Sequence, residues 1–538
     1  MAPADSAPKP FIEPATVAGE QAAVQAAHGN VSDRLVRRWY FAGLGLVYFI
    51  AFASLWSQIH GLIGERGLLP ADRYFTVARE QLGTDAFWRL PSLCWWGSSD
   101  LMLHVWCAIG TSLSIVMMSG FAPRMALVGL WMIYLSLSTA GQAFLSFQWD
   151  TLLLEMTVCS LLYAPRGIRP TWNNLPEPLP LARWLLWSLA FKLMFLSGIT
   201  KLLSGDPAWS DGTALMFHYY TQPLPSWTSW YAYQLPSSAH HVSIVLLLII
   251  EAVLPFLIFA GQRGRAVFGV ATILLMLVIE GTGNFGFFNL QTMVLAIPLL
   301  SDSLLRRIFQ RKVPTPSGSH PGTVRLPWRI WIGSGLAVLI LFVSSLVSVR
   351  EMARTQSSDL APSLARTALN WVDTSVVSWC EPRILRPMAP LRSINGYGLF
   401  RVMTTRRHEI VIEYSRDGVT WHACEFPYKP GQVDRAPPIV APHMPRLDWQ
   451  MWFAALNPRA SSDWLTALTG RILEGDEATA RLIRCPELAR DPPMLVRLAY
   501  YEYKFSSAEQ RRATGAWWSR THVGNLTGPL SKRNEPAP

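Results

Sequence analysis

Apolar stretches about 20 residues long recur along the first two thirds of this 538-residue chain. A stretch of this length can cross the hydrocarbon core of a bilayer as one α-helix. Half of the residues are hydrophobic and only 15% are charged, a composition that is too apolar for a soluble enzyme of this size. We therefore predict a polytopic α-helical membrane protein.

The pattern predicts about nine spans. The stretch 149–164 is short, and 266–282 lies close to 286–303, so totals of about eight or ten also fit the pattern. The predicted spans are 39–58, 101–119, 122–142, 149–164, 182–201, 242–260, 266–282, 286–303 and 329–349.

The positively charged residues predict the orientation of the spans. Arg and Lys accumulate in the cytoplasmic loops of membrane proteins, and here basic loops alternate with loops that carry almost no Arg or Lys. Arg34, Arg37 and Arg38 precede the first span, which places the N-terminus in the cytoplasm. An odd number of spans then places the chain after residue 349 in the periplasm of a bacterium or in a eukaryotic lumen. These loops also account for the net charge of +11, so we predict no nucleic-acid partner.

The residues after the last span have the pattern of a soluble domain. The segment "HEIVIEYSRDGVTWHACEF" holds two β-rich runs around Asp417-Gly418, which is a hairpin signal. The segment "SSDWLTALTGRILEG" begins with helix-start residues and has Gly475 after its end, and "MLVRLAYYEYKF" is strand-like. We predict a soluble α+β domain over 390–525 on the periplasmic or lumenal side.

The remaining segments complete the predicted organisation. Residues 1–33 lack the apolar core and the cleavage site of a signal peptide, so we predict a disordered tail, and a second tail over 526–538. Between them, 34–349 form the membrane domain, and 350–389 form a linker or an amphipathic surface segment.

The six cysteines show neither a C-x-x-C motif nor a metal-ligand spacing. Cys107 and Cys159 lie within apolar runs, where packed thiols are expected. The other four lie outside these runs, so one disulfide is compatible with the sequence, but its partners are not defined. These four are Cys94, Cys380, Cys424 and Cys485.

Ionisable side chains in the predicted spans are the first candidates for a functional site. Each costs about 2.5–3.5 kcal/mol on insertion at the centre of a span, so each needs a structural or a functional reason. Ion pairs between helices are the simpler of the two explanations. Lys192 has apolar neighbours and is predicted to pair with a glutamate. The candidates are Asp150, Glu155, Lys192, Lys201, Glu251 and Glu280.

Lys201 ends its span and has two interpretations. It can extend toward water at the membrane surface, or it can act as a base. A base needs a lowered pKa and access to substrate, whereas a carboxylate neighbour would keep the amine charged. Lys192 lies about 13.5 Å away along the helix and on the other side of it. Both amines can enter one small site only if the helix breaks, and Gly198 is the residue that permits a break.

The stretch 206–236 follows Lys201 and has an unusual composition for a loop. It holds seven aromatic rings between Phe217 and Tyr233 and few charges, so we expect it to cover the bundle or to lie at the membrane interface. His218 in this stretch is either an acid–base group or a packed interfacial histidine. His104, His240 and His241 form no recognisable ligand set, and we predict no metal and no cofactor.

Several segments together resemble the lipase maturation factor family. The resemblance runs in the same order from about residue 34 to about residue 518 and includes the soluble tail. The segments that carry it are "GLIGERGLLP", "FQWDTLLLEMTVCSLLYAP", "SGITKLLSGDPAWSDGTALMFHYYTQPLPSW", "GNFGFFNLQTM", "NGYGLFRVMT" and "RLDWQMWFAAL".

The resemblance implies a membrane-embedded folding factor. Animal members of the family reside in the endoplasmic reticulum, where they assist the folding and dimer assembly of secreted lipases, and their C-terminal domain contacts these clients in the lumen. The implied partners are therefore an exported protein and membrane lipid, and the bias toward Ala, Arg and Trp indicates a bacterial member in the inner membrane. The residues that the motifs single out are Asp206, Trp209, Tyr219, Gln222 and Pro223 in the loop, and Asp448, Trp449 and Trp452 as client contacts.

The membrane half also resembles, more distantly, the horizontally transferred transmembrane domains that include the vitamin K-dependent γ-glutamyl carboxylase. In that comparison Lys201 matches the catalytic base. The carboxylase has two adjacent lysines, whereas Thr200 precedes Lys201 here. The lysine can therefore be a base, a relic or a structural contact of Asp206.

Two functions follow as hypotheses. The first is a maturation factor without catalysis, in which the tail and the loops 59–100 and 202–240 form one client surface. The second is a membrane enzyme that uses Lys201 as a base on a lipid, quinone or protein substrate, with Glu155 or Glu251 adjusting its pKa. A transporter would show internal repeats, and we find none in the sequence.

Overall fold

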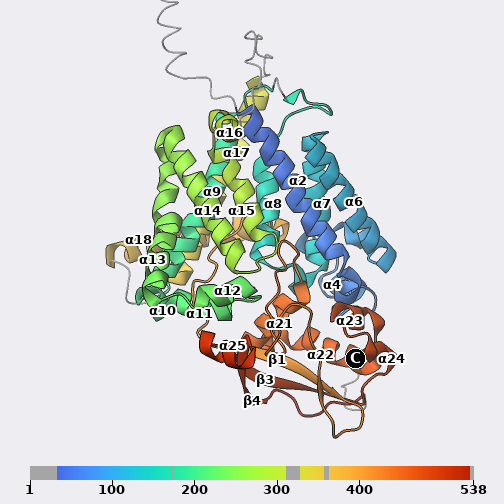
Figure 1. The fold of residues 1–538 in the computed structure, drawn as a ribbon. Coiled ribbons are helices and arrows are strands. Elements are labelled where there is room, and N and C mark those ends of the chain that lie inside the picture. The colour runs from blue at the N-terminus through green and yellow to red at the C-terminus, as the bar shows by residue number, and fades with distance from the viewer. Residues whose placement is uncertain (1–32, 173–174, 310–326, 357–362, 533–538) are drawn as a thin grey trace, which may run out of the picture.

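The computed structural model of the protein describes residues 33–172, 175–309, 327–356 and 363–532. A bundle of long helices occupies one end of the molecule, and a small sheet with short helices covers the other end (Figure 1). Residues 1–32, nearly all of the first predicted tail, and residues 533–538, the last part of the second, lie outside the described residues.

Six helices in the described residues are long and apolar enough to cross a membrane, and a bent helix pair would raise the total to seven. The count of about nine is therefore not confirmed. The six are α2 (Arg34–Trp56), α6 (Asp100–Ser119), α9 (Pro180–Leu203), the composite helix Ser237–Phe259, α14 (Gly261–Thr282) and α17 (Pro327–Thr355).

The other three predicted spans are helical but are not among these six helices. α8 (Gln148–Ser160) has 13 residues and rises about 20 Å, less than the roughly 30 Å of the hydrocarbon core. α7 (Pro123–Ala140) ends in the buried polar side chains Ser136, Ser138 and Thr139. α15 (Phe288–Ala296) continues through η6 (Ile297–Leu299) and meets α16 (Asp302–Phe309) at a bend of 118°. These helices lie among the longer ones, so protein rather than lipid covers much of their surface (Figure 1).

The composite helix changes its hydrogen-bonding pattern in the middle of the bundle. α13 (Ser237–Leu248) passes into the π-helical turn η4 (Ile249–Val253) and then into the 3-10 segment η5 (Leu254–Phe259). Pro255 lacks an N–H and cannot continue regular α-helical bonding, which accounts for the irregularity. Glu251 lies in the π turn and faces α9 across Gly198, where an added Cβ would lie 2.8 Å from the Glu251 Cβ. Gly198 therefore permits α9 and the π turn to approach closely. It does not break α9, which was the other role that the sequence allowed for it.

Short helices connect the spans at the end of the bundle that carries the sheet (Figure 1). The first connection, which follows α2, consists of α3 (Ile59–Ile63), α4 (Ala71–Leu82), α5 (Asp85–Arg89) and η1 (Leu93–Trp96). η2 (Gln142–Leu145) links α7 to α8. The aromatic stretch after Lys201 folds into α10 (Pro207–Ser210), α11 (Ala214–Thr221) and α12 (Trp227–Tyr233).

Most of the described part of the predicted linker 350–389 is helical. It follows α17 as α18 (Ser363–Val372), η7 (Asp373–Val377), α19 (Ser378–Cys380), η8 (Glu381–Leu385), α20 (Arg386–Met388) and η9 (Ala389–Leu391). Val377, Cys380 and Leu385 pack against Val343 and Leu346 of α17. The segment thus turns back along the last long helix before the soluble part of the chain begins.

The C-terminal part holds an antiparallel sheet with the strand order β2-β1-β3-β4. The strands are β1 (Arg407–Ser415), β2 (His422–Ala423), β3 (Leu495–Phe505) and β4 (Trp518–Asn525). The predicted hairpin is confirmed, with Gly418 at a φ of 76° in its turn. The strand at "MLVRLAYYEYKF" is also confirmed, and β4 is a strand that the sequence analysis missed.

Helices cover one side of this sheet. α21 (Arg446–Leu456) packs on β1, and α22 (Ser462–Glu474) packs on β3. α22 ends at Gly475 as predicted. η10 (Pro458–Ser461), α23 (Glu477–Leu482), α24 (Glu487–Arg490) and α25 (Ala508–Thr514) complete the domain. α21 lies between the sheet and the end of the helical bundle (Figure 1).

A buried ion pair joins the two parts. Arg446 on α21 donates to both carboxylate oxygens of Asp150 at the start of α8, at 2.8 and 2.9 Å, and to the carbonyl of Phe144 at 2.8 Å. Tyr134 on α7 also donates to this carboxylate. Both charged side chains are essentially inaccessible to solvent. The hydrogen bonds satisfy the carboxylate and most of the guanidinium, as a buried pair requires.

Arg446→Met is expected to lower the free energy of unfolding by about 3–5 kcal/mol, because it leaves the Asp150 carboxylate buried without its partner. The matched control is Arg481→Met, which removes an exposed ion pair with Glu477 and should cost less than about 1 kcal/mol. Thermal unfolding of the two purified variants in the same detergent compares them. Equal losses would contradict the structural role of the Arg446 pair.

Candidate functional site

The ionisable residues predicted within the bundle have partners in the structure. Lys192 pairs with Glu155, and Lys201 pairs with Glu251 at 2.6 Å. The predicted pairing of Lys192 with a glutamate is confirmed, and the two lysines occupy separate sites on an unbroken α9. Glu280 has an amide partner, because Asn289 Nδ2 donates to its carboxylate at 2.7 Å.

The Glu155 carboxylate connects three parts of the chain. It pairs with Lys192 on α9 and accepts hydrogen bonds from the Tyr397 hydroxyl at 2.6 Å and from the Asn395 backbone N–H at 3.0 Å. Asn395 and Tyr397 belong to the segment "NGYGLF" that leads into the soluble domain. This charge in the bundle therefore positions the connection between the two domains.

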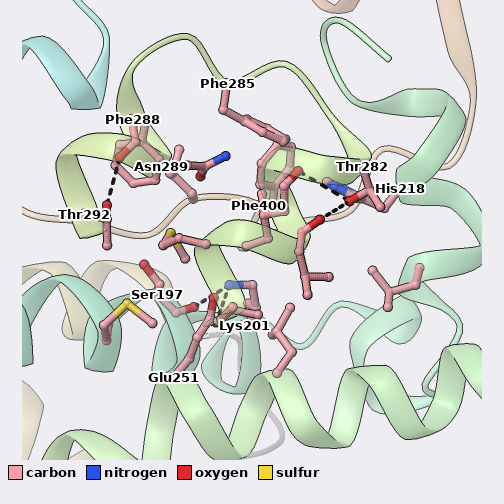
Figure 2. A pocket seen from close by; sticks show the side chains of 18 of the residues that line it. Ser197, Lys201, His218, Glu251, Thr282, Phe285, Phe288, Asn289, Thr292 and Phe400 are labelled. Atoms are coloured by element: carbon pink, nitrogen blue, oxygen red, sulfur yellow. Dashed lines mark hydrogen bonds and ion pairs between the residues drawn. The ribbon is translucent and has the colours of Figure 1, made fainter. Parts of the chain in front are cut away.

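Lys201 and Glu251 lie in the wall of a cavity of ≈ 150 Å³, which we call the Lys201 cavity. Lys201 Nζ donates to Glu251 and to the carbonyl of Ser197 at 3.0 Å (Figure 2). It also lies 5.4 Å from the centre of the Trp209 ring. The rest of the wall is largely apolar and aromatic, and α9, α11, α13, α14 and α15 contribute to it. A paired charge in an apolar wall can orient a polar head group while the surroundings hold a hydrocarbon part.

His218 on α11 lines the same cavity and is held by aromatic packing (Figure 2). Its ring stacks over Phe285 at 6.3 Å and meets the edge of Phe400 at 4.9 Å between ring centres. Burial, aided by the nearby charge of Lys201, lowers the pKa of His218 to about 4. The ring is therefore neutral near pH 7. It can donate a hydrogen bond to a ligand or accept one from it.

The loop residues singled out by the sequence dock the soluble domain. Asp206 caps α10 through the Ala208 N–H at 2.9 Å and also accepts from the Met403 N–H. Among the interpretations left open for Lys201 was a contact with Asp206; the structure pairs Lys201 with Glu251. Trp209 Nε1 donates to the carbonyl of Phe400 at 3.0 Å.

The next turn of the loop contacts both the bundle and the soluble domain. Gln222 Nε2 donates to the carbonyl of Thr282 at 2.8 Å, and Tyr219 packs near His240 at the cavity wall. The Pro223 carbonyl accepts from the buried Arg407 of β1 at 2.8 Å. Arg407 also donates to the carbonyl of Tyr220 at 3.0 Å. The loop is thus fixed to the edge of the soluble domain.

The three residues expected to contact a client are buried. Asp448 accepts from the backbone N–H groups of Tyr428 at 3.0 Å and Lys429 at 2.8 Å. Trp449 is 3% exposed, and Trp452 Nε1 donates to the carbonyl of Thr221 at 2.8 Å. None of the three therefore presents an exposed side chain for direct contact with a client.

Several docking residues were missed by the sequence analysis. Arg446, Tyr397 and Arg407 lie outside the predicted spans, so the cost of burying a charge in lipid did not single them out. Their position in the sequence could have pointed to them. Arg446 and Tyr397 lie in segments that carry the family resemblance, and Arg407 begins a β-rich run. In the described residues no cluster of three metal-ligating side chains occurs. The six cysteines are buried free thiols, so the structure contains no disulfide between them.

These features define a class: an integral membrane protein in which a helical bundle with paired internal charges is closed at one end by a soluble sheet domain. Comparison with known proteins then identifies its family. The family model for the lipase maturation factor transmembrane domain matches residues 35–307, and that for the lipase maturation factor C-terminal domain matches 393–528. The chain belongs to the lipase maturation factor family.

Individual relatives match over most of their length. The chain is 34% identical to human lipase maturation factor 2, with 91% of this chain and 82% of the relative covered. It is 31% identical to bovine lipase maturation factor 1, with 93% and 90% covered. No solved structure is significantly similar to it.

The pKa of Asp448 gives a test of its buried position. Burial raises this pKa to about 6, although two backbone N–H groups and Lys429 oppose the shift. Since the folded pKa lies above the ordinary value of 3.8, the carboxyl group adds stability below pH 3.8, and this contribution is lost as the pH rises through about 6. Asp448→Asn keeps a side-chain oxygen for the two N–H groups and removes the titration.

The unfolding temperature of Asp448→Asn relative to wild type is therefore expected to increase between about pH 5 and pH 7.5. Asp463→Asn, at an exposed position on α22, is the matched control and should show no such trend. If the unfolding temperatures of the two variants depended on pH in the same way, the pKa of Asp448 would not be raised in the folded protein.

Proposed function

We propose that the protein is a membrane-embedded maturation factor that assists the folding of exported hydrolases, and of lipases in particular. The observation that carries this proposal is the family match over both the bundle and the soluble domain. The names of the relatives, lipase maturation factors 1 and 2, supply the client class.

The geometry supports a client surface at the sheet end of the molecule. The soluble domain is fixed to the bundle through Arg446, Arg407 and Tyr397, so it can present a rigid surface. The connections after α2 and after α9 lie at the same end (Figure 1). Exposed aromatic side chains are found on them, including Trp88 and Trp96, which are 59% and 80% exposed. Exposed apolar side chains of this kind favour contact with partially folded chains or with the membrane surface.

The distribution of Arg and Lys supports the orientation of this surface. Arg34, Arg37 and Arg38 at the start of α2 favour a cytoplasmic N-terminus. The sheet domain then faces the periplasm of a bacterium, with the protein in the inner membrane, or the lumen of the endoplasmic reticulum in a eukaryote. Exported proteins fold in both compartments, which agrees with the proposed role.

The alternative is a membrane enzyme that uses Lys201 as a base. The Lys201 cavity supplies a place for a substrate, but the amine is already bound to the Glu251 carboxylate and to the Ser197 carbonyl. The pairing disfavours proton abstraction, because a carboxylate partner stabilises the charged amine. We therefore assign Lys201 a structural or ligand-orienting role.

The first experiment uses a strain from which the gene has been deleted. The activity per unit mass of secreted lipases is expected to fall in this strain and to recover when the wild-type gene is restored. Exported hydrolases other than lipases are measured in parallel to define the client range. Unchanged specific activity of every exported lipase would contradict the proposal, and a fall in secreted mass alone would indicate a role in export.

The role of Lys201 is tested in the same strain with two variants. Lys201→Met alone leaves Glu251 buried without a cation, at a cost of about 3–5 kcal/mol, whereas Lys201→Met with Glu251→Gln removes both charges. For a folding factor, the double variant should restore lipase activity substantially better than the single variant. If both variants are inserted at wild-type levels and both fail, the role of Lys201 is not purely structural, and the amine itself is required, as a ligand-orienting group or as a base.

A further inference from the structure

The first connection between the long helices carries a cluster of exposed aromatic side chains. The cluster lies on the segment 71–96, which consists of α4, α5 and η1. Phe87, Trp88 and Trp96 are 47%, 59% and 80% exposed. Rings of this size are mostly buried in proteins, and neighbouring exposed ones mark a surface that meets a partner or a membrane. The position of the segment relative to the bilayer decides between these two.

Hydrogen bonds fix η1 to the last turns of α7. The Leu93 N–H donates to the Ser136 hydroxyl at 2.8 Å, and the Ser92 hydroxyl donates to the Ser136 carbonyl at 3.1 Å. Thr139 donates to the carbonyl of Pro91 at 3.2 Å. η1 therefore lies at the level of Ser136, at the end of the bundle that carries the sheet domain (Figure 1).

The outer face of α7 shows where the acyl chains end. α7 packs beside the long helix α6 and leaves one apolar stripe exposed. Met125, Val128 and Met132 form this stripe at helical spacing and are 69%, 43% and 42% exposed. Ser136, one turn further along, is only 2% exposed. Four residues of α-helix rise about 6 Å, so η1 lies just beyond the last lipid-facing side chain of α7.

The start of α6 gives the same level from a second helix. α6 begins at Asp100, and Leu101 in its first turn is 72% exposed, as expected for a side chain that faces lipid. Trp96 precedes Leu101 by five residues. The head-group region adds about 5–8 Å to each side of the hydrocarbon core, and Trp is enriched there. Trp96 is thus held at the depth that Trp side chains favour.

The other rings of the segment pack around the same point. The ring centres of Phe75 on α4 and Phe87 on α5 lie 4.6 and 4.7 Å from that of Trp95 on η1. Aromatic packing of this kind joins α4, α5 and η1 into one unit. The exposed rings of Phe87, Trp88 and Trp96 are therefore carried by a unit that is attached to α7.

The charges of the segment are balanced. Residues 71–90 contain three basic and three acidic side chains, which are Arg73, Arg79, Arg89, Asp72, Glu80 and Asp85. The arginines can bind the phosphate groups of lipids. With no net charge, however, the segment has no electrostatic preference for an anionic bilayer over a zwitterionic one. The aromatic rings are the feature that distinguishes this surface.

We propose that the segment 71–96 is an interfacial anchor, in which Phe87, Trp88 and Trp96 lie in the phospholipid head-group region at the sheet end of the bundle. A phospholipid surface is favoured over a client chain because the rings continue the lipid-facing surfaces of α6 and α7. Interfacial anchors of this kind set the depth and tilt of the helices that they join. The sheet domain and the connection after α9 then remain as the surface for a client. The proposal requires an integral membrane protein and does not rest on the maturation function.

The test measures the depth of spin labels in the purified full-length protein in phosphatidylcholine nanodiscs. A nitroxide is attached to Trp88→Cys and to Trp96→Cys. Val419→Cys, at an 82% exposed position on the hairpin, is the matched control. The six native cysteines are buried, so they should not react with the label. Collisions with oxygen, which concentrates in lipid, are compared with collisions with a water-soluble nickel complex. Thermal unfolding confirms that each labelled variant is folded.

The labels at positions 88 and 96 are expected in the head-group region, within about 8 Å of the edge of the hydrocarbon core. The label at position 419 is expected in water. The depths at 88 and 96 should be the same in nanodiscs made from an equal mixture of phosphatidylcholine and phosphatidylglycerol, because the segment carries no net charge.

Two results would overturn the proposal. The labels at 88 and 96 could be as accessible to the nickel complex as the label at 419, and shielding of them by an added unfolded lipase would then make the segment a client site. The labels could also reach the bilayer only when phosphatidylglycerol is present, which would assign the contact to the arginines and not to the rings. Lipase rescue in the deletion strain is measured separately, so neither result bears on the proposed maturation function.

Discussion

The pairing of buried charges is the constraint on which the rest of this structure depends. A carboxylate within a helical bundle must find a cation or several hydrogen-bond donors, because lipid and apolar side chains supply neither. Asp150 and Glu155 lie on a helix too short to cross a bilayer. Asp150 is paired with Arg446 of the soluble part, and Glu155, whose cation Lys192 belongs to the bundle, also accepts hydrogen bonds from Tyr397 and Asn395. The soluble domain is therefore a partner that the bundle requires.

This requirement also explains where the cavities lie. Docking brings the aromatic helix α21 and the segment 398–404 against the ends of α8, α11 and α15, and these large rings leave spaces between them. One space contains the Lys201–Glu251 pair, and the other lies between α21 and the segment 398–404. Both spaces are composite, so each depends on contacts between segments more than 100 residues apart in the chain.

The sequence analysis succeeded where one local rule decides the structure. Gly418 and Gly475 mark a hairpin and a helix end correctly, because both positions need a left-handed backbone conformation that glycine adopts readily. The sequence analysis gave a higher number of spans than the structure does. The reason is that apolar length does not distinguish a helix covered by lipid from a short helix such as α8 that is covered by protein. It missed β4, whose polar and largely exposed residues follow no apolar alternation. The cost of charge burial correctly selected Lys192 and Glu251 as residues with a special environment, but it could not select their partners.

The sequence by itself determined that this is a membrane protein with a soluble C-terminal part and that it resembles the lipase maturation factors, because hydrophobic length and ordered motifs are properties of the linear chain. Only the tertiary structure decided that Lys201 binds Glu251 and not Asp206, that the motif tryptophans face inward, and that aromatic side chains from both domains enclose a cavity. The physical reason is that an ion pair or a cavity wall is set by distances across the fold. Residues such as Asp150 and Arg446, nearly 300 positions apart, come together only when the helices and the sheet have packed.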